Sequence, residues 1–259
     1  MTEGSPLHLR LARDDRDLRA AQRLRYAVFV EELGASGDLV DHDRRLEIDA
    51  FDAQCDHLVL VDPARSGLDD VVAAYRLLPS DRAVDGFYSA AEFDLDPLQR
   101  SGRKLLELGR SCVHPDMRGG LAVAQMWAGL ADYVVARGIE ILFGPASFRG
   151  TDLQALAQPL SLLHRDHLAP PELRVRAIGA SARTMDILHP EQIDRRAAML
   201  AVPSLIKAYL RLGGCVGDGA WIDHAFNTTD VCLVMDTARM GERYNSFSAR
   251  RGAGHGVAG

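Results

Sequence analysis

The chain has 259 residues, of which 47% are hydrophobic and 25% are charged, and its formal net charge is −6. This is the composition of a globular protein with enough apolar side chains for a sizeable core, and its negative balance argues against nucleic acid as a partner. The first ten residues lack an apolar segment and no stretch approaches about 18 apolar residues, so neither a signal peptide nor a membrane span is expected.

The four cysteines show no C-x-x-C pair and no zinc-ligand spacing with histidine; they are Cys55, Cys112, Cys215 and Cys232. This pattern predicts reduced, mostly buried thiols in a cytoplasmic protein, with no metal site.

Apolar patterning predicts the first elements of the fold. Residues 8–12 alternate as in a strand, and Asp14 can cap a helix that runs to about residue 33. The acidic, polar stretch 35–54 is expected to form a long loop. Two apolar runs within 56–79 predict an antiparallel hairpin.

The middle of the chain alternates between strands and helices. Residues 87–98 predict a short helix or an ordered loop, and 104–113 a strand. The apolar spacing of 121–137 is helical, with Gly138 as its C-cap. A further strand is predicted at 139–148, and T-x-x-Q at 151–154 reads as a capping box for a helix to about residue 167.

The C-terminal part adds a strand at 173–178, helical turns over 191–212 that are interrupted at Pro203, and a last strand at 230–236. Residues 248–259 have the composition of a disordered tail. This order of elements predicts an α/β sandwich built on a mixed sheet.

The sequence LELGRSCV (106–113) carries an acid and a base inside an apolar strand. Alternation places Glu107 on one face of this strand and Arg110 on the other. A half-buried charge needs a partner or a chemical role, so the pair indicates either a structural ion pair or a catalytic group.

The residues after this strand lead through a glycine-containing turn into the helix at 121–137. Val113 ends the strand, and Arg118, Gly119 and Gly120 form the turn. Free N–H groups and the dipole at such a helix start favour an anion, although an ordinary turn has the same composition.

Three earlier segments place charges among apolar residues. Arg25 lies on the apolar stripe of its predicted helix, four residues before Phe29, and Arg76 lies inside an apolar strand. The acids of the loop are clustered: Glu47, Asp49 and Asp52. Taken singly, Arg25 could be a solvated helix charge, Arg76 a charge on an edge strand, and the acids part of a solvated loop.

Together, the four segments resemble the homoserine-lactone autoinducer synthases, a branch of the GNAT-type N-acyltransferases. The shared pattern is an Arg four before a Phe, two acids three apart, an Arg on the next strand, and a Glu three before an Arg. The tryptophan that follows the Phe in those synthases is missing from VEELGASGD. The turn is one residue shorter than the GNAT pyrophosphate turn R-G-x-G-x-G/A, which favours a carrier-protein donor over coenzyme A.

The C-terminal part resembles a sister family. PSLIKAYLRLGG (203–214) and AWIDHAFNTTDV (220–231) are similar to signatures of the ornithine N-acyltransferases of bacterial ornithine-lipid synthesis, often labelled hemolysin-like. Without the resemblance, the first segment is an amphipathic helix with Lys207 and Arg211 on its wet face, and the second a turn before a strand.

The resemblance implies one GNAT-like domain over 8–247, with a mixed, mostly antiparallel central sheet flanked by helices. It implies transfer of a 3-hydroxyacyl group from acyl carrier protein to the α-amine of L-ornithine, giving lyso-ornithine lipid. No cofactor beyond the carrier's phosphopantetheine is implied, and contact with the inner-membrane surface is compatible with this product.

The resemblance also implies roles for individual residues. Glu107 and Arg110 are the expected catalytic pair, with Glu107 as the base for the amine. The expected substrate-binding residues are Arg25, Phe29, Asp49, Asp52 and Arg76. The expected acyl-donor residues are Val113, Arg118, Gly119 and Gly120, with a backbone N–H near Val113 serving the oxyanion.

Three competing interpretations remain at this point. The first is an autoinducer synthase that uses S-adenosylmethionine, and the second is an ordinary acetyl-CoA acyltransferase. The third, from another class, is a non-catalytic membrane-associating protein. Lysine or glutamine in place of ornithine also stays open, because acceptor choice depends on a few pocket side chains.

Overall fold

The computed structural model describes residues 6–37, 40–119 and 121–239. The chain divides into two compact units. The first comprises Met1–Tyr88, Leu106–Gly138 and His224–Asn227, and the second comprises Ser89–Leu105, Ile139–Asp223 and Thr228–Gly259. The single domain expected over 8–247 stays a prediction, and the tail expected at 248–259 lies outside the described residues.

The first unit is built on antiparallel strands in the order β1-β4-β5-β7. Their bounds are β1 His8–Leu11, β4 Asp56–Val61, β5 Val71–Pro79 and β7 Leu105–Val113. All nine residues of β5 are buried, which is why its sequence is almost continuously apolar. The predicted first strand, the hairpin and the strand at 104–113 are therefore confirmed.

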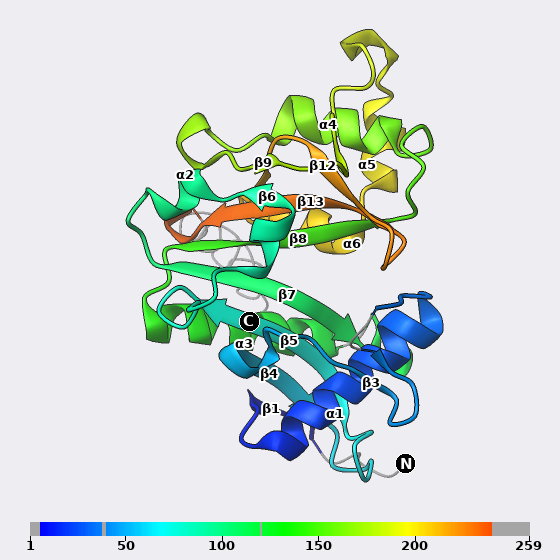
Figure 1. Ribbon diagram of the computed structural model, residues 1–259, viewed down its shortest axis with the longest axis vertical. Helices are drawn as coiled ribbons and strands as arrows, with labels where there is room; N and C mark the ends of the chain where they lie inside the picture. The colour runs from blue at the N-terminus through cyan, green and yellow to red at the C-terminus, as the bar shows by residue number, and fades with distance from the viewer. Residues whose placement is uncertain (1–5, 38–39, 120, 240–259) are drawn as a thin grey trace, which may run out of the picture. The chain divides into compact units, whose positions relative to one another are not determined.

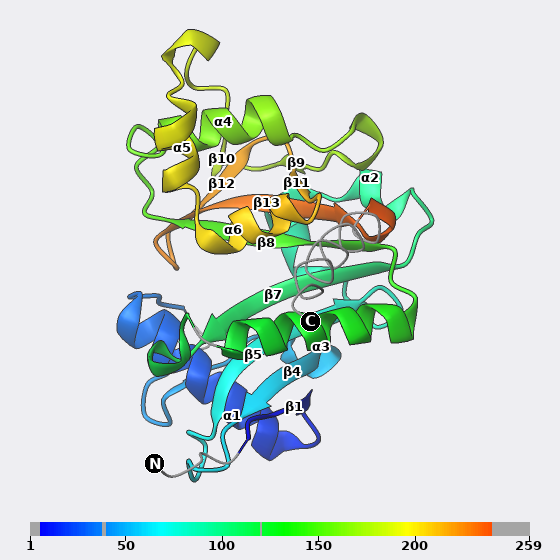
Figure 2. The same ribbon diagram turned by 180° about the vertical axis from the view of Figure 1, so that it is seen from behind.

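Two helices cover opposite faces of these strands (Figures 1 and 2). Helix α1 (Asp15–Arg25) begins where the Asp14 side chain accepts the N–H of Asp17, and it packs on β5. It continues as a π-helix, η1 (Tyr26–Glu32). Helix α3 (Leu121–Arg137) packs on β4, β5 and β1 and has the bounds predicted from its apolar spacing.

The stretch expected as a loop at 35–54 is more ordered than predicted. It contains the paired two-residue strands β2 (Val40–Asp41) and β3 (Leu46–Glu47) and the 3-10 turn η2 (Asp52–Gln54). Helix α1 packs against β3. This packing buries acids that composition alone assigns to solvent.

In the second unit, β8 pairs along its length with β13, which also pairs with β12 and β11. Strand β12 pairs in turn with β10. A separate two-stranded sheet pairs β6 with β9. The bounds are β6 Phe93–Asp94, β8 Ile141–Arg149, β9 Arg176–Ala177, β10 Ala182–Arg183, β11 Cys215–Val216, β12 Ala220–Asp223 and β13 Thr228–Asp236.

The helices of the second unit are shorter. Helix α6 packs on β13, and α4 packs on α5 and β11 (Figure 2). Their bounds are α2 Asp96–Gln99, α4 Ala157–His167, α5 Arg195–Ala201 and α6 Ser204–Arg211. The interruption predicted at Pro203 separates α5 from α6. The sheet is mostly antiparallel and is flanked by helices, as expected.

The predicted capping box at 151–154 is wrong. Helix α4 begins only at Ala157, and no side chain caps it. The Asp152 carboxylate accepts the N–H of Gln154 at 2.9 Å, which folds this stretch into a local turn instead.

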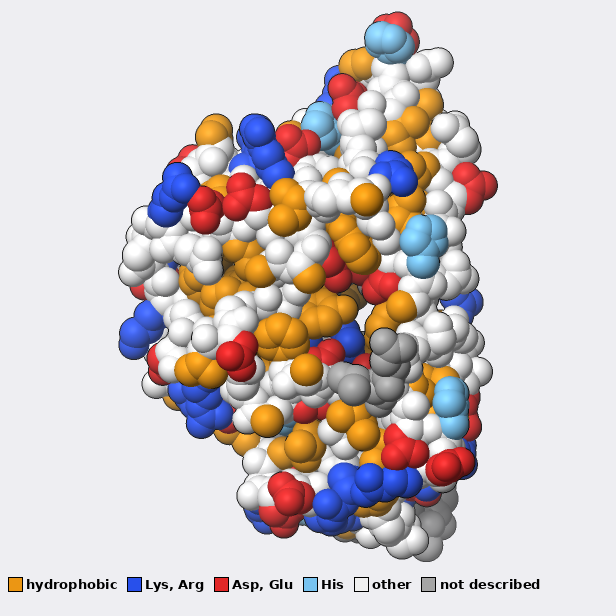
Figure 3. Space-filling model, viewed as in Figure 1, with side chains coloured by type: hydrophobic (Ala, Val, Ile, Leu, Met, Phe, Trp, Pro, Cys, Tyr) orange, Lys and Arg blue, Asp and Glu red, His pale blue; other side chains and the backbone are white. Residues whose placement is uncertain are grey.

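Two further features of the structure concern membrane spans and surface charge. Among the described residues, no helix is both long and apolar enough to span a membrane. On the face shown in Figure 3, Lys and Arg side chains lie dispersed among Asp and Glu side chains.

Candidate functional site

A β-bulge sets the geometry of the site in the first unit. Ala74 pairs with Cys112 and Arg76 pairs with Gly109, so Tyr75 on β5 faces two residues, Arg110 and Ser111, on β7. Arg110 has a φ of 53°, a left-handed conformation that is uncommon for a residue other than glycine. The extra residue breaks the two-residue alternation of β7.

The bulge overturns the expectation that Glu107 and Arg110 lie on opposite faces. The Glu107 carboxylate accepts the N–H of Tyr88 at 2.8 Å, and the Arg110 guanidinium lies 4.8 Å from the centre of the Tyr88 ring. Both charged groups therefore reach the same neighbour. Glu107 is only 3% exposed, so it is a buried carboxylate held by a backbone donor.

Three arginines and three acids form a buried, charge-balanced network next to this pair. Arg25 contacts Glu47 through Nε and Asp52 through Nη1 (2.6 Å). Arg76 Nη1 lies 2.7 Å from Asp49. Arg110 donates from Nε to Glu47 at 3.2 Å and from Nη2 to Asp49 at 2.7 Å. The predicted residues Arg25, Asp49, Asp52, Arg76 and Arg110 thus meet in one cluster.

The two predicted acids are already engaged by donors. Besides its arginine contacts, Asp49 accepts the N–H of Phe51 at 2.8 Å, and Asp52 accepts Gln22 Nε2 at 2.9 Å and the N–H of Asp49 at 3.1 Å. Burial alone would raise the pKa of both acids, but the neighbouring arginines lower it below the ordinary value. A bound ammonium group would compete with these arginines.

Aromatic rings hold two of the arginines. The Arg110 guanidinium lies 4.8 Å from the ring centre of Tyr88 and 4.7 Å from that of Phe226. The Arg76 guanidinium lies 5.2 Å from the ring centre of Tyr88. Burial opposes the charge of Arg110, yet Glu47 and Asp49 keep its pKa above the ordinary value. Arg110 is therefore a fixed cation with a defined orientation.

Arg25 and Arg76 are not the solvent-exposed charges that the sequence alone also allowed. Arg25 is 1% exposed, so it is no solvated helix charge, and Arg76 is buried in a central strand of its sheet rather than at an edge. Phe29 packs on the core formed by α1, β4 and β5, and its ring meets Phe226 edge-on at 6.2 Å. Phe29 thus supports the aromatic side of the site.

The expected acyl-donor residues follow β7. Arg118 Nε donates to the carbonyl of Val113 at 3.1 Å, and its two Nη atoms bind Glu32. Gly119 has a φ of 76°, the left-handed conformation that favours glycine in a turn. Gly120 lies outside the described residues.

Cys112, also on β7, is a structural residue. It is buried among the side chains of α1, β4 and β5, and burial raises the pKa of its thiol to about 12. The thiol therefore stays protonated at neutral pH and cannot serve as a nucleophile there.

Three buried carboxylates also meet in the second unit. Oxygens of Glu92, Asp223 and Asp230 lie within 4.8 Å of one another. Asp223 ends β12 and Asp230 lies on β13. Oxygen ligands at this spacing can hold a hard cation, but carboxylates alone identify no ligand.

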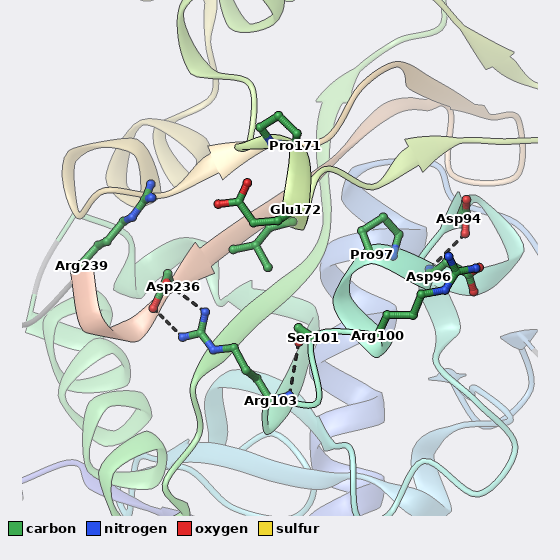
Figure 4. A pocket seen from close by; sticks show the side chains of 11 residues that line it. Asp94, Asp96, Pro97, Arg100, Ser101, Arg103, Pro171, Glu172, Asp236 and Arg239 are labelled. Carbon is green, nitrogen blue, oxygen red and sulfur yellow. Dashed lines mark hydrogen bonds and ion pairs between the residues drawn. The ribbon is translucent and has the colours of Figure 1, made fainter.

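A surface cavity of about 680 Å³ also lies in the second unit (Figure 4). Its charged side chains are largely paired, since Arg103 binds Asp236 at 2.9 and 2.7 Å and Arg100 contacts Asp96. Arg239 and Glu172 also line this cavity. The cavity has none of the residues predicted for the site.

Sequence reasoning missed several members of the site. Glu47 belongs to the acidic cluster noted in the sequence, yet no role was expected for it. Phe226 lies in the FNTTDV signature, which was expected to form a turn. Gln22 and Tyr88 carry no sequence signal, because only the fold brings them to Asp52 and Glu107.

Comparisons with known proteins match both the site segments and the chain as a whole. The model of the acetyltransferase (GNAT) domain matches residues 24–128, which include the cluster and β7. An L-ornithine N(alpha)-acyltransferase of Rhodobacter capsulatus is 61% identical over 252 residues, covering 96% of each chain. The enzyme of that name from Agrobacterium fabrum is 42% identical over 247 residues, covering 93% of this chain and 84% of its own.

Among solved structures, the AHL synthase LasI is similar at 16% identity and a TM-score of 0.48, with 90% of this chain and 91% of that chain covered. The relatives of high identity cover the chain almost end to end, including its C-terminal signatures.

Proposed function

We propose that this chain, which belongs to the family of L-ornithine N(alpha)-acyltransferases and is an acyltransferase with a GNAT domain, transfers a 3-hydroxyacyl group from acyl carrier protein to the α-amine of L-ornithine. The product is a lyso-ornithine lipid. The observation that carries the proposal is the 61% identity that extends over 96% of both chains. Because the match extends over almost the whole of both chains, it includes the segments that carry the proposed site.

The reaction begins with an amine that must lose a proton, because free α-amines have a pKa near 8. Glu107 is the proposed base, acting directly or through one water. Its carboxylate is buried and is oriented by the N–H of Tyr88 at 2.8 Å. A base fixed in this way needs little reorganisation when the amine arrives.

The deprotonated amine attacks the thioester carbonyl carbon. A C–N bond forms, the tetrahedral oxyanion collapses, and the C–S bond breaks. The phosphopantetheine thiolate leaves and takes up the proton that the amine has lost. A backbone N–H near Val113, at the end of β7, is the proposed donor to the oxyanion.

The arginine–acid network supplies the proposed acceptor site. Arg76 and Arg110 are the candidates for the ornithine carboxylate, since a guanidinium can bind a carboxylate with two parallel hydrogen bonds. Asp49 and Asp52 are the candidates for the side-chain ammonium. Arg25 orders the acidic segment by its contacts with Glu47 and Asp52.

Acyl carrier protein as the donor remains the finer part of the proposal. The turn that begins at Arg118 is one residue shorter than the GNAT pyrophosphate turn, and a carrier-bound arm presents no pyrophosphate. Peripheral contact with a membrane surface is proposed only because the product is an amphiphile.

A mass-spectrometric assay tests the proposal. The protein is incubated with 3-hydroxypalmitoyl carrier protein and, separately, with ornithine, lysine, glutamine, glycine or S-adenosylmethionine. The expected result is an N-acyl product with ornithine and free carrier protein. Two results would overturn the proposed acceptor: formation of a lactone from S-adenosylmethionine, or formation of an N-acyl product from another amine and none from ornithine.

A further inference from the structure

The ion pair between Glu32 and Arg118 lies at the start of the expected donor turn. Arg118 Nη1 and Nη2 lie 2.7 and 2.6 Å from the two carboxylate oxygens of Glu32. Arg118 Nε donates to the carbonyl of Val113 at 3.1 Å. All three nitrogens of this guanidinium are therefore engaged within the protein.

This arrangement changes what the turn offers to a phosphate. A guanidinium that binds a carboxylate with both arms cannot at the same time bind a phosphate in that manner. The Glu32 carboxylate also repels any anion that approaches this guanidinium. Gly119, the next residue, has the left-handed φ of 76° that continues the chain into the turn.

Glu32 is the last residue of the π-helix η1, and its neighbour Glu31 is engaged elsewhere. Glu31 binds Arg45 through both oxygens, at 2.6 and 2.7 Å. The chain thus places two adjacent acids on two separate arginines. Glu31 is a control for Glu32 that matches it in charge, in side chain and in local helix.

The consequence of the Glu32–Arg118 pair concerns ligand choice more than folding. The side chains are 34% and 43% exposed, and ion pairs with such exposure contribute little to stability. A like charge about 6 Å from a phosphate nevertheless changes its affinity by a factor of about three to a hundred, depending on the local dielectric. Removal of Glu32 should therefore alter binding without unfolding the protein.

We propose that Glu32 is a donor-specificity determinant, which occupies Arg118 and thereby selects against the pyrophosphate of coenzyme A. A carrier-bound phosphopantetheine arm carries a single phosphodiester in place of the pyrophosphate and 3′-phosphate of coenzyme A, so it is penalised less. The inference rests on the proposed acyl-transfer function and names the residue that separates the two donor classes.

Steady-state kinetics with the same acyl group on coenzyme A and on carrier protein test this inference, with ornithine as acceptor. The ratio of KM for acyl-CoA to KM for acyl-carrier protein is expected to fall about tenfold in Glu32→Gln. It should not change in Glu31→Gln. An unchanged ratio in Glu32→Gln, or an equal fall in Glu31→Gln, would overturn the inference.

Direct binding separates this inference from the proposed function. Titration calorimetry with free coenzyme A needs no turnover, and Glu32→Gln is expected to bind it about tenfold more tightly than the wild type. Equal affinity of the two proteins contradicts the role of Glu32. If the wild type made no product with either donor, the proposed function would fail while the affinity comparison would still decide the inference.

The double variant Glu32→Gln/Arg118→Met identifies the source of the gain. If the gain comes from the released guanidinium, coenzyme A affinity should return to within about twofold of the wild type. A gain that persists without Arg118 contradicts the proposed competition for this arginine. Circular dichroism of each variant checks that the fold is kept.

Discussion

Arg110 and Asp49 are joined by an ion pair of 2.7 Å that links the bulge of β7 to the acidic segment before η2. Asp49 also forms an ion pair with Arg76, and Arg110 also forms one with Glu47. In this network every charge is compensated by its neighbours. Loss of one member therefore leaves an opposite charge buried without its partner, which costs far more than the net contribution of the pair.

Arg25→Met is expected to lower the free energy of unfolding by about 3–5 kcal/mol, because Glu47 and Asp52 would lose a buried counter-charge. Arg23→Met on the same helix is the control, since Arg23 is partly exposed and lies 3.4 Å from an exposed Asp69. Its cost should stay below about 1 kcal/mol. Urea unfolding measures both, and similar losses would contradict a special role for the buried arginine.

Glu107→Gln is expected to lower kcat by about 10²-fold or more, because an amide cannot accept the proton of the amine. The amide oxygen can still accept the N–H of Tyr88, so the melting temperature should change little. Kinetics with ornithine and acyl-carrier protein provide the measurement. Wild-type kcat in this variant would remove Glu107 from the mechanism without affecting the family assignment.

Gly109→Ala tests the packing of Arg76. A Cβ atom at Gly109 would lie 3.3 Å from Arg76 Nη2 and 3.4 Å from Nε, so the guanidinium must shift by a few tenths of an ångström. The expected results are a stability loss of about 1 kcal/mol and a several-fold higher KM for ornithine. Gly37→Ala, whose Cβ would meet only Val40 at 4.0 Å, should change neither quantity. A normal KM in Gly109→Ala would argue against Arg76 as a substrate ligand.

The elements that the sequence predicted well have locally encoded patterns. Helix α3 follows directly from apolar spacing that ends at Gly138, and β4 and β5 follow from two apolar runs around a polar turn. The helix start expected from T-x-x-Q at 151–154 is wrong, because the Asp152 side chain accepts the N–H of Gln154 and α4 begins only at Ala157. The capping box and the Asp152 turn are both plausible from the sequence of this segment, and the sequence does not show which of the two forms.

Five members of the cluster could be selected from the sequence, whereas its geometry could not. The resemblance selected Arg25, Asp49, Asp52, Arg76 and Arg110, and the structure brings them together. The shared neighbour of Glu107 and Arg110 depends on a left-handed arginine at the bulge, which the two-residue period of a strand does not reveal. Arg118 was expected among the acyl-donor residues, and the ion pair of its guanidinium with Glu32 could not be read from the sequence.

Asp17→Asn tests how much the charge of one buried carboxylate contributes to the free energy of unfolding as the pH changes. The Asp17 carboxylate is buried and binds Arg10, with one contact of 3.0 Å, and it accepts the N–H of Arg13 at 2.9 Å. The hydrogen bond from Arg10 lowers the pKa of Asp17 from 3.8 to about 2, although burial opposes this shift.

Because the folded-state pKa lies below the unfolded value, Asp17 stabilises the protein fully above pH 4, and this stabilisation is lost as the pH falls toward 2. Asp17→Asn should therefore cost about 2 kcal/mol at pH 7, and the difference from the wild type should shrink below pH 4. The exposed Asp15→Asn on the same helix turn should cost only a few tenths of a kcal/mol. Urea unfolding of the wild type and the two variants at pH 7, 5 and 3.5 measures these free energies. If the stability loss of Asp17→Asn is the same at all three pH values, the charge of Asp17 is not what stabilises the fold.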